Sequence, residues 1–395
     1  MHLTIVSPFP PTITGIGQYG YYVTRALARS RMFSRITVLA GSSKMGIRPN
    51  HLGLTEVEYC WGPDLPSARH AILSRVKHLS PDLVWFNLGA SIFGKSPWLN
   101  LSGLLLPMLA QRMRYPTVVT LHELIELSDL RALNAPGGPF APLGARLLTS
   151  IATQADVTCL TMRNYADLLA ARQVDSVHIP IGAYHEPHLL DESNSQELLF
   201  FTTLAPFKGL ELLLEAFLML RTEYPCLKLN IAGSEHARFP NYPSELRTKF
   251  SRTNGVHWLG QIPEDHVMEL FRRAQIVVLP YTASTGSSSV LYQAATWGRP
   301  VVASDLQETQ ALITESNLLV EIFKSGDVNG LCNALRTLLN SPEKRSAQSK
   351  HNFNSIQHAR PESTCRKYIE VFNYALKKHG SSSRIQIPSG KMETE

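Results

Sequence analysis

The sequence has no apolar run that approaches the roughly 20 residues of a membrane-spanning helix. The longest candidate, Leu104–Ala110, is interrupted by Pro107 and followed by Arg112 and Arg114. With 44% hydrophobic and 18% charged residues, the composition also excludes a mostly disordered chain. We therefore expect a soluble globular protein.

Cysteine is scarce, and no two cysteines lie close together. An odd number of scattered cysteines, with no histidine at ligand spacing, predicts reduced thiols and excludes a disulfide framework or a zinc site. The N-terminus also lacks the basic segment and long apolar stretch of a secretory signal. We expect a cytoplasmic protein. The cysteines are Cys60, Cys159, Cys226, Cys332 and Cys365.

Acidic residues are missing from the start of the chain, where the first is Glu56 and the first fifty positions carry six Lys and Arg. Residues 1–190 hold 16 basic and 11 acidic side chains, whereas residues 191–395 hold 22 and 21. This imbalance favours an anionic partner, such as a lipid headgroup or a phosphate, but a solvated basic face explains it equally well. We exclude nucleic acid because no basic cluster is interleaved with aromatic residues.

Short apolar, β-branched runs alternate with helical patterns along the whole chain. At 395 residues this pattern predicts two α/β domains, each doubly wound around a parallel sheet, which face each other across a cleft. The expected strands are Leu3–Val6, Ile36–Ala40, Leu83–Phe86, Thr117–Leu121, Val157–Leu160, Val177–Ile179, Leu198–Thr202, Leu227–Ala232, Val256–Leu259, Ile276–Leu279, Val301–Ala303 and Leu318–Val320. The clearest helical patterns in the first half are Tyr19–Ala28 and Leu143–Ala155.

The stretch Gly182–Gln196 is polar and rich in turn residues, and it predicts the linker between the domains. We expect one domain over 1–185 and the other over 196–360. A helix over 361–378 is expected to return to the N-terminal domain, and residues 381–395 are expected to be a disordered tail.

The segment Gly15–Gly20 matches the dinucleotide-binding pattern G-x-G-x-x-G. Eight residues separate these glycines from the strand, and no acidic residue ends the second strand to hold a ribose. These departures reject a nicotinamide or flavin site. A glycine turn that opens a helix remains; it either offers backbone N–H groups to an anion or serves only as a turn.

Three more segments place polar residues at the expected ends of strands. His122 and Glu123 follow the strand Thr117–Leu121, at the edge where doubly wound sheets bind ligands, although a single histidine there is more often structural. Lys208 precedes a helix whose dipole also favours a phosphate, although such a lysine alone is more often a solvated loop residue. Ser287–Ser289 open another helix, either as an anion site or as plain caps.

Taken together, these segments resemble the retaining glycosyltransferases of family 4, a group with the GT-B fold. Their order and spacing match from about residue 3 to 375. The matching segments are Pro10–Gly17, His122-Glu123, Leu204–Gly209, Ile231–Gly233, Trp258–Gly260 and Gly298–Asp305.

The resemblance implies a C-terminal domain that binds a nucleotide-sugar donor and an N-terminal domain that receives a carbohydrate, lipid-linked or small-molecule acceptor. It implies that His122 contacts the donor sugar and that Lys208 neutralises the diphosphate as its charge grows, so these two are the expected catalytic residues. It further implies no divalent metal and no cofactor. The expected donor-binding residues are Gly15, Gly17, Thr203, Lys208, Gly233, Thr285, Ser288, Ser289, Val290 and Gln293.

The chain departs from this family at three of these positions. Thr285 and Gln293 stand where the family usually has two glutamates, which accept bonds from the sugar and from the ribose. Thr203 stands where an arginine usually shares the diphosphate charge, and a charge-assisted hydrogen bond is worth about 1.5–3 kcal/mol. We expect weaker donor binding unless another cation compensates.

Two hypotheses follow for the whole chain. The first is a metal-independent glycosyltransferase that retains anomeric configuration, and the alternative is a non-catalytic GT-B scaffold that binds a partner or a glycan. A further hypothesis is peripheral docking on the anionic inner face of a membrane through the stretch 104–114, against the simpler interpretation of that stretch as a core helix.

Overall fold

The structure, a computed structural model, describes residues 1–11, 14–41, 46–48, 55–127, 141–236, 238–284 and 286–380. Contacts divide these residues into two units. Unit 1 comprises the described residues up to Ile181 together with 361–380, and unit 2 comprises those from Gly182 to Arg360.

Unit 1 is built on a sheet of eight strands in the order β3-β4-β2-β1-β5-β6-β7-β8. Neighbouring strands pair in parallel, apart from β3 and β4, which are antiparallel. Every residue of β5 and β6 is buried, which explains why both strands are mainly apolar, with Asn87, Thr117 and Thr120 as their polar residues. The strands are β1 (His2–Pro8), β2 (Arg35–Gly41), β3 (Gly46–Arg48), β4 (Thr55–Trp61), β5 (Leu83–Leu88), β6 (Thr117–Leu121), β7 (Val157–Leu160) and β8 (Ser176–His178).

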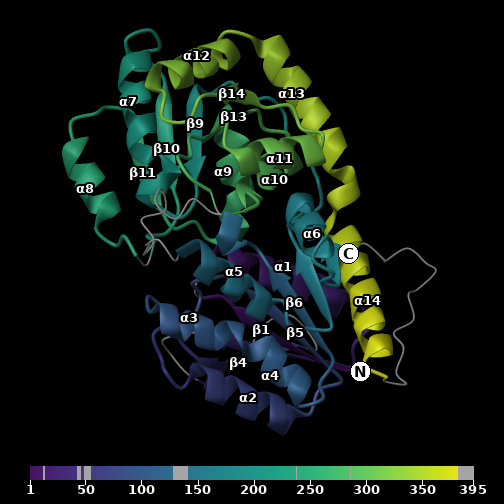
Figure 1. The fold of residues 1–395 in the computed structure, drawn as a ribbon. Helices are drawn as coiled ribbons and strands as arrows, with labels where there is room; N and C mark the ends of the chain where they lie inside the picture. Colours follow the sequence, from purple (N-terminus) through teal and green to yellow (C-terminus); the bar gives the residue numbers. More distant parts are fainter. Residues whose placement is uncertain are drawn as a thin grey trace. The chain divides into compact units, whose positions relative to one another are not determined.

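Helices flank this sheet, as Figure 1 shows. Helix α14 (Pro361–Lys378) packs against α1 (Gly15–Arg29), and the hydroxyl oxygens of Tyr19 and Tyr368 lie 2.7 Å apart between them. The C-terminal helix is therefore part of unit 1. The other helices are α2 (Ala68–Leu79), α3 (Pro97–Leu104), α4 (Leu106–Arg112), the 3-10 helix η1 (Ile125–Leu127), α5 (Ala141–Ala152) and α6 (Arg163–Ala170).

Unit 2 is built on a parallel sheet of six strands in the order β11-β10-β9-β12-β13-β14. The chain runs outward from β9 in one direction and from β12 in the other, so the order reverses between these two strands. The strands are β9 (Glu197–Phe201), β10 (Lys228–Ala232), β11 (Val256–Gly260), β12 (Ile276–Leu279), β13 (Val301–Ser304) and β14 (Glu321–Phe323). The helices are η2 (Pro206–Lys208), α7 (Leu210–Arg221), α8 (Tyr242–Lys249), η3 (Glu264–His266), α9 (Val267–Arg273), α10 (Ser289–Thr296), α11 (Gln307–Glu315), α12 (Val328–Leu339), α13 (Pro342–Ser355) and η4 (Ile356–Ala359).

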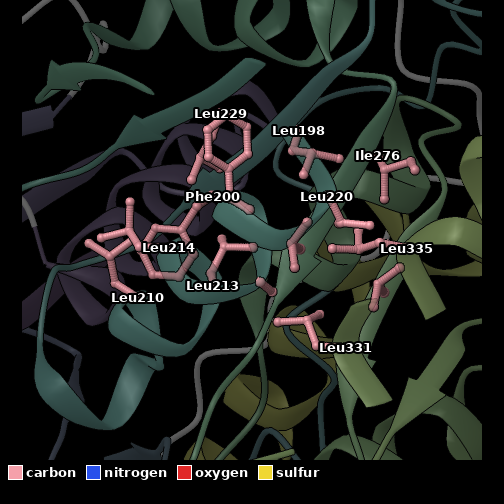
Figure 2. Close-up of a cluster of buried hydrophobic side chains, with 14 of the residues drawn as sticks. Leu198, Phe200, Leu210, Leu213, Leu214, Leu220, Leu229, Ile276, Leu331 and Leu335 are labelled. Carbon is pink, nitrogen blue, oxygen red and sulfur yellow. The ribbon is translucent and has the colours of Figure 1, made fainter. Parts of the chain in front are cut away.

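The core of unit 2 lies where α7 and α12 pack on β9, β10 and β12. Leu210, Leu213 and Leu214 recur at helical spacing along one face of α7, and all three are fully buried. Figure 2 shows them in one buried cluster with Leu198 of β9 and Leu335 of α12. Burying each such side chain stabilises the fold by about 1.5–3 kcal/mol. The loops at the carboxyl ends of these strands are therefore attached to a well-packed core.

The observed strands and helices differ from the predicted ones in a few places. The strand predicted at Leu318–Val320 is found at β14, a few residues later. Strands β3 and β4 are absent from the expected set, because β4 alternates buried residues with exposed or half-buried ones such as Glu56 and is not a continuous apolar run. The stretch 104–114 forms the end of α3 and helix α4, and Leu106 and Ala110 are fully buried, which fits a core helix.

The predicted linker Gly182–Gln196 contains no helix or strand, but it is bonded to unit 2. The Ala183 N–H donates to the Ala359 carbonyl (2.8 Å), and Ser195 Oγ donates to the Arg273 carbonyl (2.6 Å). The division between the units consequently falls between Ile181 and Gly182, and not at 185 and 196. The predicted tail, 381–395, lies outside the described residues. Within the described part of the chain, no helix combines the length and the apolar character that crossing a bilayer requires.

Candidate functional site

The reversal of strand order in unit 2 places two loops side by side at the carboxyl ends of β9 and β12. Such a topological switch point is where doubly wound sheets bind ligands, because the loops on either side diverge and leave a crevice. The loop after β9 carries Thr203 and Lys208, and the loop after β12 leads to Ser288, Ser289 and α10.

Lys208 is held in place by contacts between these two loops. Its Nζ lies 4.1 Å from the centroid of the Tyr281 ring, which is a cation–π contact. The Thr282 N–H donates to the Phe207 carbonyl (3.0 Å). Gly209 has a φ of +70°, and a Cβ there would lie 1.8 Å from the Pro280 carbonyl oxygen, so only glycine permits this close approach.

The start of α10 has no side-chain cap among the described residues. Ser288 occupies the N-cap position but makes no side-chain capping hydrogen bond, so the expected serine cap is not formed. Ser287 Oγ is buried and has no hydrogen-bond partner among the described residues. The N–H groups of Ser289 and Val290 lie in the first helical turn, where no intrahelical acceptor exists and the helix dipole favours an anion.

Gln293 lies one turn further along α10 and is 5% exposed. Buried Tyr281 faces the hydroxyls of Thr202 and Ser288, and burial raises the pKa of its phenol. Thr285, expected to contact the donor sugar, lies outside the described residues.

Gly233 follows β10 and holds the neighbouring turn close to β9. Its φ is +139°, and a Cβ there would lie 1.7 Å from the Thr202 carbonyl oxygen. The turn continues through His236 and Arg238, which the sequence patterns did not single out. The rings of Phe207 and His236 have centroids 5.6 Å apart in an edge-on contact. Burial lowers the pKa of His236 to about 4, and the charges of Arg238 and Lys208 add to this, so two cations and a neutral ring gather here.

Unit 1 has the same kind of switch point between β1 and β5, but its hydrogen-bonding groups are already used. Thr14 caps α1, and its Oγ1 accepts from the Gly17 N–H (2.9 Å). The expectation of a bare N–H group therefore fails at Gly17. The backbone at Gly15 is open, since a Cβ there would meet no atom within 4 Å.

His122 lies at the carboxyl end of β6 and is fixed by Asn87. Asn87 Nδ2 donates to Ser7 Oγ (2.9 Å) and to the Ile16 carbonyl (2.9 Å), so its Oδ1 is the acceptor that lies 2.7 Å from His122 Nε2. This network assigns the imidazole proton to Nε2 and leaves Nδ1 as an acceptor. Burial lowers the pKa of His122 to about 3, so the ring is neutral at physiological pH.

The structure thus places seven of the expected donor residues on the segments that follow β9, β10 and β12 of unit 2, the last three of them on α10: Thr203, Lys208, Gly233, Ser288, Ser289, Val290 and Gln293. Gly15, Gly17 and His122 belong to unit 1. The described residues contain no group of three or more His, Cys, Asp or Glu side chains that is arranged to hold a metal ion.

Comparison with a family model and with a curated protein concerns only part of the chain. Residues 195–341 match the model described as glycosyl transferases group 1, a range that includes the Lys208 loop and α10. A phosphatidyl-myo-inositol mannosyltransferase of Propionibacterium freudenreichii subsp. shermanii is 28% identical over 138 residues, which are 35% of this chain. The chain covers 33% of that enzyme's length.

Solved structures match the chain over nearly all its length. A sucrose-phosphate synthase from Thermosynechococcus elongatus is 15% identical with a TM-score of 0.71 and covers 94% of this chain and 98% of its own. Anabaena HepE in complex with UDP-glucose is 16% identical with a TM-score of 0.70, covering 94% and 99%. The trehalose-6-phosphate synthase OtsA is 13% identical with a TM-score of 0.69, covering 94% and 99%. These matches confirm the predicted α/β fold class, GT-B, and do not favour the non-catalytic alternative.

Proposed function

We propose that this protein is a glycosyltransferase that moves a sugar from a nucleotide-sugar donor to an acceptor hydroxyl. The observation that carries the proposal is Lys208, held on the Tyr281 ring at the unit 2 switch point, where the neighbouring helix α10 begins without a side-chain cap. A cation beside the N–H groups of a first helical turn, which have no intrahelical acceptor, suits a diphosphate. The match of residues 195–341 to group 1 glycosyl transferases and the UDP-glucose bound by HepE support the same class of donor.

In the proposed reaction the bond between the anomeric carbon and the diphosphate oxygen breaks, the acceptor oxygen forms the new glycosidic bond, and the acceptor's proton passes to the departing diphosphate oxygen. Negative charge grows on the leaving diphosphate, and Lys208 and the N–H groups of Ser289 and Val290 stabilise it. Such preorganised groups act where charge develops, and losing one typically costs two to three orders of magnitude in turnover. Gln293 is proposed to hold the ribose, because its amide both accepts and donates.

We propose that no divalent metal and no cofactor take part, since these groups supply positive charge to the diphosphate. Turnover that is unchanged by EDTA is the expected result, and loss of turnover that Mg²⁺ restores would contradict it. His122 is proposed to accept a hydrogen bond from the donor sugar through Nδ1, with Gly15 and Gly17 near the diphosphate. We also propose that the transferred sugar retains its anomeric configuration. The NMR signal of the anomeric proton in the product tests this.

The first experiment is a thermal-shift and calorimetric titration with UDP, GDP, dTDP, ADP and CDP. We expect one nucleotide to stabilise the protein and Lys208→Ala to weaken its binding at least tenfold. The matched control is Lys228→Ala, because Lys228 begins β10 and so lies at the amino ends of the strands, away from the loops that carry Lys208. If no nucleotide binds, or if Lys208→Ala binds as well as the wild type, the proposed donor site is wrong.

The acceptor is proposed to be lipid-linked, with the protein cytoplasmic and peripheral at an anionic membrane surface. The name of the mannosyltransferase relative includes a lipid, phosphatidyl-myo-inositol. The surface that we propose for membrane binding lies on α5 and α3. It takes the place of the stretch 104–114, which the sequence suggested for this role. Leu143 and Leu147, one turn apart on α5, are 70% and 60% exposed, and Trp98 on the neighbouring α3 is 78% exposed. Exposed Arg146 lies between the two leucines in sequence, and it complements anionic headgroups.

Sedimentation with vesicles tests this surface. We expect the protein to bind vesicles that contain about a third phosphatidylglycerol at low salt, and to bind pure phosphatidylcholine poorly. Leu147→Glu is expected to abolish binding. Leu218→Glu on α7, where Leu218 is 44% exposed, is the matched control and is expected to bind normally. Equal binding by both variants would show that another surface is responsible.

A further inference from the structure

The charge of a nucleotide sugar exceeds what Lys208 alone can balance. A diphosphate diester carries two negative charges, and the released nucleoside diphosphate carries about three at neutral pH. On the loop after β9, between Thr202 and Gly209, Lys208 is the one charged side chain, and Thr203 is neutral. A site that stabilises the leaving group therefore needs a further cation close to Lys208.

The turn after β10 is folded against the Lys208 loop and carries such a cation. Leu204 pairs with Glu235 as an isolated parallel bridge, and the His236 N–H donates to the Leu204 carbonyl (3.2 Å). The Phe239 N–H then donates to the His236 carbonyl (2.8 Å), which closes the turn. Arg238 lies on this turn, and its N–H donates to His236 Nδ1 (3.2 Å).

An aromatic cluster joins the two cations. The centroid of the Phe239 ring lies 6.0 Å from that of Phe207 and 5.5 Å from that of His236. The guanidinium carbon of Arg238 lies 5.3 Å from the Phe239 centroid, and Lys208 Nζ lies 5.7 Å from the Phe207 centroid. A guanidinium that rests on a ring loses less conformational freedom when it binds an anion.

Electrostatics in the cluster agree with an anion site. The charges of Arg238 and Lys208 both disfavour protonation of His236, so both lie near that ring, and burial keeps its pKa at about 4. Two cations whose fields reach the same ring repel each other in the absence of a ligand. A bound anion relieves that repulsion.

We infer that Arg238 is the second cation of the donor diphosphate site and compensates for the neutral Thr203. This inference rests on the proposed function and adds a residue on β10's loop to those on the loops of β9 and β12. A guanidinium presents paired N–H donors to phosphate oxygens, so Arg238 is expected to contribute one or two charge-assisted hydrogen bonds.

Calorimetry with the nucleoside diphosphate that the wild type binds is the direct test. We expect Arg238→Ala to weaken binding about 10- to 100-fold, with a shallower dependence of affinity on salt, and Arg238→Lys to recover part of the loss. Binding of the bare nucleoside is expected to be unchanged. The matched control is Arg247→Ala on α8, because the Arg247 guanidinium lies 5.2 Å from the Trp258 centroid in a similar contact.

A rescue experiment separates charge from structure. In the Arg238→Ala background, Thr203→Arg returns a cation to the loop after β9 and is expected to restore most of the lost affinity. If Lys208→Ala weakens nucleotide binding while Arg238→Ala does not, the role of Arg238 is wrong and the proposed function stands. If Arg238→Ala weakens nucleoside and diphosphate equally, the residue supports the fold of the turn and not the phosphates. If the wild type binds no nucleotide, both proposals fall.

Discussion

The two units share a topology at their switch points and differ in what those switch points offer a ligand. In unit 1, Thr14 Oγ1 accepts a hydrogen bond from the Gly17 N–H, and the side-chain amide of Asn87 donates to Ser7 Oγ and to the Ile16 carbonyl. In unit 2, α10 starts without a side-chain cap, and Lys208 lies at the same edge of the sheet. The same reversal of strand order thus supports an internally bonded edge in one unit and, in the other, an edge with a cation and a helix start that has no side-chain cap.

This difference shows that topology locates a candidate site while side chains decide its chemistry. A switch point whose N–H groups and amides are already bonded has little left for an anion. It can still present one well-defined acceptor, and His122 Nδ1 is such an atom. Under the proposed function, most of the anion binding therefore falls to unit 2, and His122 of unit 1 recognises a sugar hydroxyl.

Replacing one glycine in each unit is expected to give the largest contrast. Gly209→Ala forces a Cβ to within 1.8 Å of the Pro280 carbonyl at a φ of +70°, so the loops after β9 and β12 must separate. We expect a loss of about 3–5 kcal/mol in the free energy of unfolding. Gly15→Ala meets no atom and is expected to change stability by less than about 0.5 kcal/mol. Urea unfolding of both variants measures this, and equal losses would contradict the packing argument.

Removing His122 is expected to separate turnover from nucleotide binding. His122→Ala deletes the acceptor of unit 1, so we expect kcat to fall about 100-fold. The Kd of the free nucleotide, which unit 2 is proposed to hold, is expected to change less than about twofold. A steady-state assay beside calorimetry makes the comparison, with Lys208→Ala as the variant that should lose both. A large rise in the nucleotide Kd of His122→Ala would break the assignment of roles.

The sequence predicts the fold well where strands are buried on both faces. Such strands, for example Leu83–Phe86 and Ile276–Leu279, are continuous apolar runs that no surface helix imitates, and both are found. Strand β4 was not predicted, because its buried residues alternate with exposed or half-buried ones such as Glu56. The linker prediction placed the boundary late because a polar, turn-rich composition does not show that Ala183 and Ser195 are bonded to unit 2.

The site is predictable only as far as its residues lie near motif positions. Lys208 precedes a helix and Ser289 begins one, so both can be found from the sequence. His236 and Arg238 follow β10 without any motif, and their place beside Lys208 depends on the turn that the Leu204 and His236 backbones hold. In the same way, no spacing reveals that Thr14 uses the Gly17 N–H or that Ser288 makes no cap. These are results of packing between segments far apart in sequence.

Acidification is expected to destabilise unit 1 through His122. Its folded pKa is about 3, below the 6.5 of the unfolded chain, so between these values the unfolded state binds a proton that the folded state does not. This contribution is fully present above pH 6.5 and is lost as the pH falls towards 3, which amounts to about 2 kcal/mol by pH 5. Hydrogen exchange of β5 and β6 amides at pH 7 and pH 5 reports it after correction for intrinsic rates. His122→Gln, which does not titrate, is expected to flatten the dependence.

The smallest expected effect is a change in the pKa of His236. It is the effect most specific to unit 2, because the His236 ring lies near both Lys208 and Arg238. A bound nucleoside diphosphate brings negative charge next to Lys208 and Arg238 and offsets the repulsion that disfavours protonated His236. We expect the pKa of His236 to rise from about 4 by about one unit, equivalent to about 1.4 kcal/mol. NMR titration of the ring protons with and without nucleotide measures the rise, and the bare nucleoside is the control. Arg238→Ala is expected to raise the pKa of His236 in the free protein, because one of the opposing charges is gone. A nucleotide that binds without moving this pKa would place the diphosphate elsewhere in unit 2, and Arg238 would lose its proposed role even if Lys208 kept its own.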